Sequence, residues 1–266
     1  PDADRLNKLF EDKFKEVEGF EQIVKDLKAQ LTGKEAKAVR QIEKNLALKS
    51  GIPIDRIEMT GLPYESANMV YTSYKTVLQK YPELKGELAA FEYDGVYGGA
   101  YAGCKALTGE IKAHGIFGNY EKIVRQYADD VAAGFHPIGT DHTSVIVHEL
   151  GHALDGYMTK KNLCGGLVNR YGVRRSCVDI CQEVLAKSGY VVPSRADLKK
   201  QGYTYSQIND IIIKDRRDFI TKQVSEYAAD NEREFFAECF AEYVMSNKPR
   251  KAAQIFGEII DDALGR

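Results

Sequence analysis

The sequence predicts an α+β protein in which a small mixed sheet is combined with many helices. Apolar residues recur at three- and four-residue steps over much of the chain, which indicates amphipathic helices. Short runs rich in apolar and aromatic residues lie in the middle of the chain, next to glycine-containing turns, and they indicate strands. Hydrophobic residues make up 44 % of the 266 residues, which suits a packed globular fold.

The first 51 residues are expected to form a helical hairpin. Apolar positions follow a helical period over residues 6–31 and again over 36–46, and Thr32-Gly33 is expected to break the helix between them. No cluster of catalytic residue types lies here. We therefore expect the apolar stripe of the hairpin to pack against the main domain or a partner.

Residues 54–266 are expected to form one domain. Pro63 is placed to begin a helix that runs to about Tyr81. Strands are predicted in the segments LAAFEY, YAGCKAL and EIKAHGIF, and helices over NYEKIVRQYADDVAA, over the segment that follows Asp141, and over most of the remaining chain.

Charge and hydropathy favour neither nucleic acid nor a membrane as partner. The net charge is only −2, and no apolar run approaches the roughly 20 residues that span a bilayer. No signal peptide is visible in this chain, so both a cytoplasmic and a secreted location stay open.

The five cysteines do not resemble a disulfide framework, because their number is odd and they are widely spread. Cys164, Cys177 and Cys181 lie nearest one another. A second metal site there is one alternative, but the CxxC spacing is missing, and buried thiols are the favoured interpretation.

The segment TSVIVHELGHALDGY contains residues whose spacing suggests a metal site. On a helix, His148 and His152 lie one turn apart and can bind the same ion. Zinc suits such a site, since it accepts nitrogen and carboxylate ligands. Glu149 is placed to take the proton of an attacking water as general base. Asp155 continues the histidine face, where we expect it to support the ligand residues. The alternative is two histidines placed on a helix for packing or surface reasons.

A third ligand is expected from the segment SEYAADNEREFFAECFAEYVMS. The pattern HExxHxxGxxH fails, which excludes a metzincin. Glu234, Glu238 and Glu242 follow one another at four-residue steps, where like charges repel unless a cation or donors lie opposite. We favour Glu234 as the ligand and Glu238 as the acceptor of the second N–H of a ligand histidine. A solvated acidic face is the alternative, and Glu232 is a second candidate ligand, by analogy with the Asn-Glu pair of thermolysin-like enzymes.

The segments HELGHALD and YAADNEREFFAECF resemble the zincin domain of the anthrax lethal factor family, to which the clostridial Pro-Pro endopeptidases are related. That family carries a Y-x3-N-x2-E-F-F-A-E pattern after its HExGH helix. The matching residues here are Tyr227, Asn231, Glu234, Phe235, Phe236, Ala237 and Glu238.

The resemblance implies a zincin-like catalytic domain over residues 54–266, with His148, His152 and Glu234 as zinc ligands and Glu149 as base. It also implies that Tyr227 donates a hydrogen bond to the oxyanion, which a phenol neutral at pH 7 can do.

The implied activity is that of a zinc metalloendopeptidase of the gluzincin type, acting on a peptide or protein substrate. The alternative is a catalytically silent zinc-binding domain with a structural or assembly role in a phage or toxin polypeptide. The 81 residues between His152 and Glu234 exceed what a compact member needs. An insertion near 160–205 is therefore expected to overhang or shape the cleft.

The remaining histidines are expected to lie outside the site. His136 and His142 are interpreted as loop histidines. His114 is interpreted as an ordinary half-exposed strand residue, with a place beside an extended substrate as the alternative.

Overall fold

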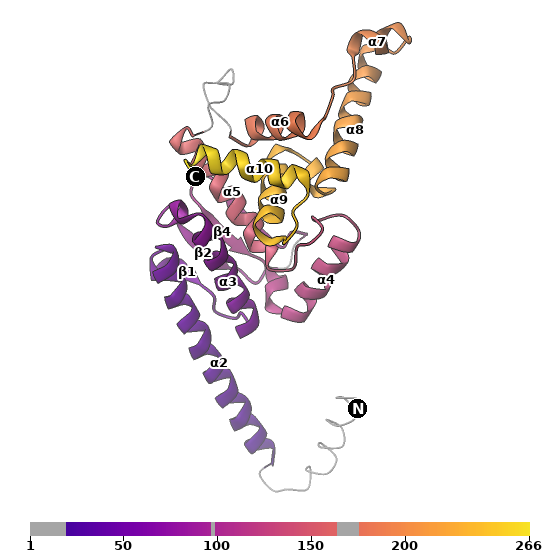
Figure 1. The fold of residues 1–266 in the computed structure, drawn as a ribbon. Helices are drawn as coiled ribbons and strands as arrows, with labels where there is room; N and C mark the ends of the chain where they lie inside the picture. The colour runs from indigo at the N-terminus through magenta and orange to yellow at the C-terminus, as the bar shows by residue number, and fades with distance from the viewer. Residues whose placement is uncertain (1–19, 97–98, 164–175) are drawn as a thin grey trace.

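The computed structural model describes residues 20–96, 99–163 and 176–266 (Figure 1). The described part is an α+β fold, which confirms the predicted class. Its helices are α2 (Phe20–Ser50), α3 (Tyr64–Lys80), α4 (Tyr120–Ala132), α5 (Ser144–Lys161), α6 (Ser176–Ser188), α7 (Arg195–Lys200), α8 (Tyr205–Gln223), α9 (Glu232–Met245) and α10 (Lys251–Ala263). Single 3-10 turns are η1 (Ile54–Arg56), η2 (Pro82–Leu84), η3 (Gly115–Gly118) and η4 (Tyr227–Ala229).

The sheet has four strands in the order β1-β2-β4-β3, with β1 at Ile57–Glu58, β2 at Ala90–Tyr93, β3 at Ala102–Lys105 and β4 at Glu110–Ala113. The pairs β1–β2 and β2–β4 are parallel, and β3 runs antiparallel to β4. The mixed sheet and the three predicted strands are thus confirmed. Sequence analysis did not predict the two-residue strand β1.

The central helix α5 connects the sheet to the C-terminal helices. It packs against β3, α3 and α9. Its residues Ile146, Leu150 and Leu154 are fully buried in this core. Phe91 on β2 meets Tyr74 on α3 edge to face, at 6.2 Å between ring centroids. The helix that carries the histidine motif is therefore buried by both the sheet and the C-terminal helices.

The N-terminal region differs from the prediction. Helix α2 runs without interruption through Thr32 and Gly33, so the expected break is wrong. A glycine inside a helix costs only about 0.5–1 kcal/mol, which helical residues on both sides offset. The first part of the expected hairpin, residues 1–19, lies outside the described residues.

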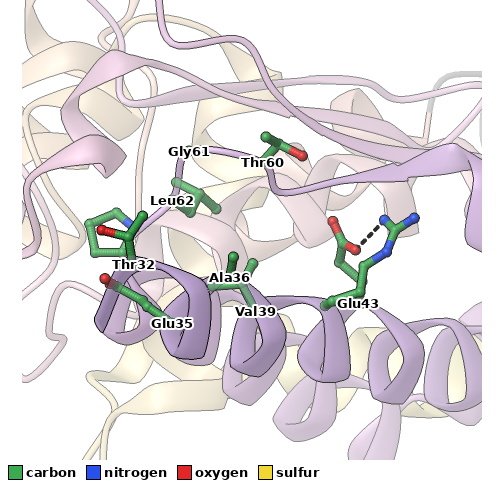
Figure 2. Close-up of a pocket in the computed structure, with 10 residues that line it drawn as sticks. Thr32, Glu35, Ala36, Val39, Glu43, Thr60, Gly61 and Leu62 are labelled. Carbon is green, nitrogen blue, oxygen red and sulfur yellow. Dashed lines mark hydrogen bonds and ion pairs between the residues drawn. The ribbon is translucent and has the colours of Figure 1, made fainter. Parts of the chain in front are cut away.

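The C-terminal part of α2 is fixed to the domain through Glu43. This buried carboxylate accepts hydrogen bonds from Arg40 at 2.6 Å and from the backbone N–H of Met59 at 3.0 Å. A surface hollow lies between α2 and the segment 60–63 (Figure 2). The helix also packs along α3, and its N-terminal part extends away from the domain (Figure 1).

The region predicted as an insertion has two different parts. Helix α6 packs against α9 and α10 and buries Cys177 and Cys181 as free thiols, so part of this region belongs to the core. Helices α7 and α8 extend from the end of the molecule opposite to α2 (Figure 1). Cys164 lies outside the described residues. None of the described helices is both long and apolar enough to cross a bilayer.

Candidate metal centre

Helix α5 is positioned by its ends and by a glycine in its middle. Asp141 accepts a hydrogen bond from the backbone N–H of Thr143, the N-cap residue, at 2.8 Å. A Cβ on Gly151 would lie 3.0 Å from a ring carbon of Phe240 and 3.1 Å from the Cα of Ala237, both on α9. The glycine between the two histidines therefore lets α5 and α9 approach closely.

Helix α9 begins at a capped N-terminus. The Asn231 side chain accepts hydrogen bonds from the backbone N–H groups of Arg233 and Glu234. This cap fixes where the helix starts. It thereby places Glu234 in the first turn, directly opposite the histidines of α5.

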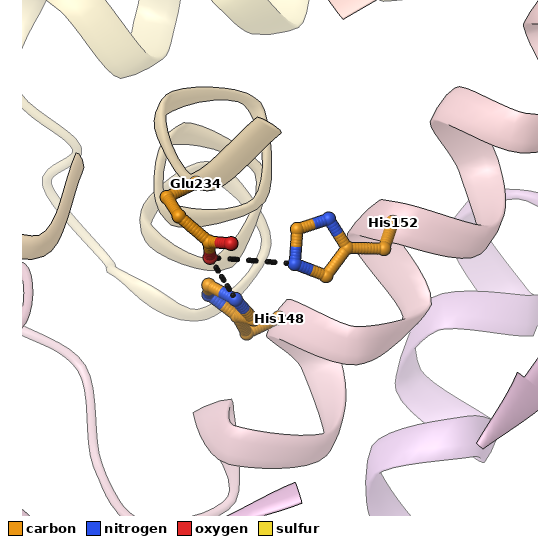
Figure 3. A group of neighbouring side chains, drawn as sticks. All are labelled: His148, His152 and Glu234. Carbon is orange, nitrogen blue, oxygen red and sulfur yellow. Dashed lines mark hydrogen bonds and ion pairs between the residues drawn. The ribbon is translucent and has the colours of Figure 1, made fainter. Parts of the chain in front are cut away.

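His148, His152 and Glu234 converge from these two helices (Figure 3). The Oε2 of Glu234 lies 3.1 Å from the Nε2 of His148 and 3.4 Å from the Nε2 of His152. The three ligand atoms all lie within 4.8 Å of one another. Ligands of a tetrahedral zinc ion stand about 3.3 Å apart, given bonds of about 2.0–2.1 Å. The donor set and its spacing therefore fit a metal ion, and this group can hold one.

The charges of the group depend strongly on one another. Burial alone would lower the pKa of His148, but hydrogen bonds to Glu234 and Glu238 raise it to about 10. Burial would raise the pKa of Glu234, but hydrogen bonds to both histidines hold it far below its ordinary value. A cation between these side chains would take over the role of the proton on His148.

Glu238 supports the histidine, as predicted. Its Oε1 lies 2.7 Å from the Nδ1 of His148, and its Oε2 accepts a hydrogen bond from Ser225 at 2.9 Å. The Nδ1 of His136 lies 3.2 Å from the same Oε2. Three donors from separate segments thus converge on one carboxylate that is 1 % exposed. Burial opposes ionisation, but the bonds to His136 and His148 lower the pKa of Glu238 to about 2.

His136 is a site residue that sequence analysis missed. It lies in a loop, as expected, but it is buried and stacks on Tyr127 at 4.8 Å between ring centroids. Its contact with Glu238 joins residues 102 positions apart. No local pattern signals such a contact, because the contact depends on how the loop packs against α9.

Tyr227 lies in η4 beside the metal group. Its ring stacks on His148 at 5.6 Å and on Phe135 at 5.2 Å. Its backbone N–H donates to the carbonyl of Phe135, and that of Glu226 donates to Gly134. Burial and the nearby Glu234 carboxylate raise the pKa of Tyr227 above its ordinary value. The phenol therefore stays protonated at neutral pH and can act as a donor.

Glu149 and Tyr227 line one pocket together with His148. Glu149 is buried, and burial raises the pKa of its carboxyl although both ligand histidines oppose the shift. A carboxyl whose pKa is raised towards neutral is a better proton acceptor than an exposed one. The arrangement therefore offers a base and a neutral donor beside a metal-binding group.

The other glutamates of α9 have separate partners. Glu242 is fully buried and pairs with Arg250 at 2.7 Å, so the alternative of a solvated acidic face is wrong. Glu232 forms an ion pair with Arg216 of α8 at 3.1 Å, and it does not belong to the metal group. The structure thus favours Glu234 over Glu232 as the ligand.

Asp155 differs from its predicted role. It is buried, and it accepts a hydrogen bond at 2.9 Å from the backbone N–H of Cys177. Within the described residues it makes no hydrogen bond to a ligand histidine. The position of α6 explains this, because the backbone N–H of Cys177 in its first turn points to the carboxylate. Asp155 therefore connects α5 to α6.

Two further histidines lie where the sequence placed them, outside the metal group. His142 lies in the turn before α5, where its Nε2 is 3.0 Å from the hydroxyl of Tyr120. His114 follows β4 and is half-buried, with its Nδ1 3.0 Å from Asp94. Among the described residues, the only group with metal-ligand spacing is the one formed by His148, His152 and Glu234.

Comparison of the chain with protein-family models, with curated proteins and with solved structures finds no match. The resemblance to the lethal factor family therefore stays a prediction that depends on two short segments. The function has to be argued from the site itself.

Proposed function

We propose that the protein is a zinc-dependent metalloendopeptidase of the zincin type. The observation that carries the proposal is the convergence of His148, His152 and Glu234, together with a pocket that His148 lines beside Glu149 and Tyr227. Structural zinc sites are usually closed by four protein ligands, whereas this group supplies three among the described residues. That count favours catalysis over a silent structural or assembly role.

His148, His152 and Glu234 are the residues that would hold the ion. Bound zinc supplies a Lewis acid that polarises a carbonyl and makes a water more acidic. Glu149 accepts a proton from the attacking water at its carboxylate and returns it to the leaving amine. The Tyr227 hydroxyl donates a hydrogen bond to the carbonyl oxygen of the scissile peptide as negative charge develops there. Glu238 accepts a hydrogen bond from the Nδ1 of His148 and so leaves Nε2 as the nitrogen that would bind the ion.

Incubation of the zinc-loaded protein with a diverse peptide library tests the proposal. New peptide termini are read by mass spectrometry, and zinc content is measured in the same samples. Glu149→Gln is the matched control, since it keeps the shape of the side chain but removes the base. We expect cleavage by the wild type, none by the variant, and equal zinc in both. Cleavage by both proteins, or by neither with zinc bound, contradicts the proposal.

A further inference from the structure

A pocket of about 320 Å³ opens beside the candidate metal centre. His148, Glu149 and Tyr227 line its catalytic end. The rest of its lining includes Tyr101 and Asp130. No lysine or arginine of the described residues lines it. The pocket is thus aromatic and acidic, without a cationic side chain of its own.

Ring contacts form a continuous wall that leads away from the metal group. Tyr227 stacks on His148, and the ring of His136 lies 5.8 Å from that of Tyr227. Tyr101 follows at 6.1 Å from His136, and Tyr127 stacks on the same histidine ring at 4.8 Å. A side chain that enters at the catalytic end would therefore pass along aromatic faces.

Asp130 lies at the far end of this wall, in the last turn of α4. The Tyr101 hydroxyl donates a hydrogen bond to its Oδ2 at 2.5 Å. A carboxylate accepts several hydrogen bonds, so one hydroxyl leaves acceptor capacity free. Within the part of the chain that the structure describes, no lysine or arginine forms an ion pair with Asp130. The half-buried charge therefore lacks a cationic partner.

We propose that this pocket binds a lysine or arginine side chain of the substrate and that Asp130 is its specificity-determining residue. The inference rests on the proposed peptidase function. Methylene groups of a long cationic side chain pack well on aromatic rings, and cations are attracted to aromatic faces. The cationic end then forms a charge-assisted bond with Asp130. An acidic side chain would be repelled, and an apolar one would desolvate Asp130 without compensating its charge.

Affinity selection separates this inference from the peptidase proposal. Zinc-loaded Glu149→Gln protein is immobilised and exposed to a peptide library in which lysine, arginine, norleucine and glutamate compete at each position. We expect peptides with lysine or arginine to be enriched about tenfold over norleucine at one position, as one charge-assisted bond would give. Asp130→Asn in the same background should abolish this enrichment. Asp129→Asn removes the same charge from the exposed neighbouring residue and should leave the enrichment unchanged.

Each outcome of this selection is decisive. Equal retention of lysine and norleucine peptides, persistence of the preference in Asp130→Asn, or retention of no peptide overturns the pocket assignment. Selection of basic peptides that the wild type does not cleave would support the pocket and contradict the peptidase. Cleavage by the wild type without any preference for basic residues would support the peptidase and contradict the pocket assignment.

Discussion

The carboxylate of Glu238 lies 2.7 Å from the Nδ1 of His148, although the two residues come from different helices. Since an ionised carboxylate can only accept, the Nδ1 carries the proton in this contact. When the imidazole loses its second proton to bind a metal, the lone pair is on Nε2, the atom that lies 3.1 Å from Glu234. Glu238 thus decides which nitrogen of His148 is available to a metal.

Glu238→Gln should weaken zinc binding about 10- to 100-fold, the usual effect of losing the partner of a ligand histidine. The amide cannot stabilise the same tautomer as strongly as a carboxylate does. Affinity is measured by competition with a coloured chelator. Glu232→Gln, on the same helix but paired with Arg216, is the control and should bind zinc like the wild type. Equal affinities for both variants would refute the positioning role of Glu238.

Zinc affinity should rise with pH. In the metal-free protein the pKa of His148 is raised to about 10, so the side chain carries a proton at neutral pH. Zinc needs the neutral imidazole and displaces that proton. Below pH 10 the apparent affinity should therefore increase about tenfold per pH unit for each displaced proton. Chelator competition between pH 6.5 and 8.5 measures this slope, and a flat profile would rule the raised pKa out.

Two glycine substitutions should have opposite effects on stability. Gly33→Ala lies in the continuous helix α2 with no atom within 4 Å of the added Cβ, and it should stabilise the protein by about 0.5–1 kcal/mol. Gly156→Ala would place a Cβ 1.8 Å from the carbonyl oxygen of Ala106, and it should cost about 3 kcal/mol or more. Urea unfolding measures both. Destabilisation by Gly33→Ala would contradict the continuous helix.

The pair formed by Glu242 and Arg250 should contribute strongly to stability. The carboxylate is fully buried, and the guanidinium also donates to the carbonyl of Val224. Arg250→Met leaves the buried carboxylate with a backbone N–H donor but no cationic partner, and it should cost about 3–5 kcal/mol. The double variant Glu242→Met with Arg250→Met should recover much of that loss, because no lone charge remains. Urea unfolding measures the loss in each variant. If the loss in the double variant equals the sum of the losses in the two single variants, the two residues do not form a coupled pair.

The parts of the site that the sequence predicted are those with a local pattern. His148 and His152 share a face because four residues make nearly one turn, and Glu234, Glu238 and Glu242 recur at the same spacing on α9. Neither inference needs knowledge of the rest of the chain. That Glu234 lies beside the histidines was expected from its acidic helix and from the resemblance, and the structure brings the three side chains together.

The parts that the sequence could not predict depend on long-range packing. His136 reaches Glu238 only because its loop folds against α9, and Asp155 points to α6 because that helix begins beside it. The break expected at Gly33 failed for another reason. A weak local preference was outweighed by the helical residues on both sides.

X-ray diffraction from zinc-loaded crystals at the zinc absorption edge tests the central claim most directly. The account predicts one anomalous peak about 2.0–2.2 Å from the Nε2 atoms of His148 and His152 and from a carboxylate oxygen of Glu234. The peak should disappear in Glu234→Ala crystals prepared in the same way. A zinc peak elsewhere, with none between these three residues, would contradict the account.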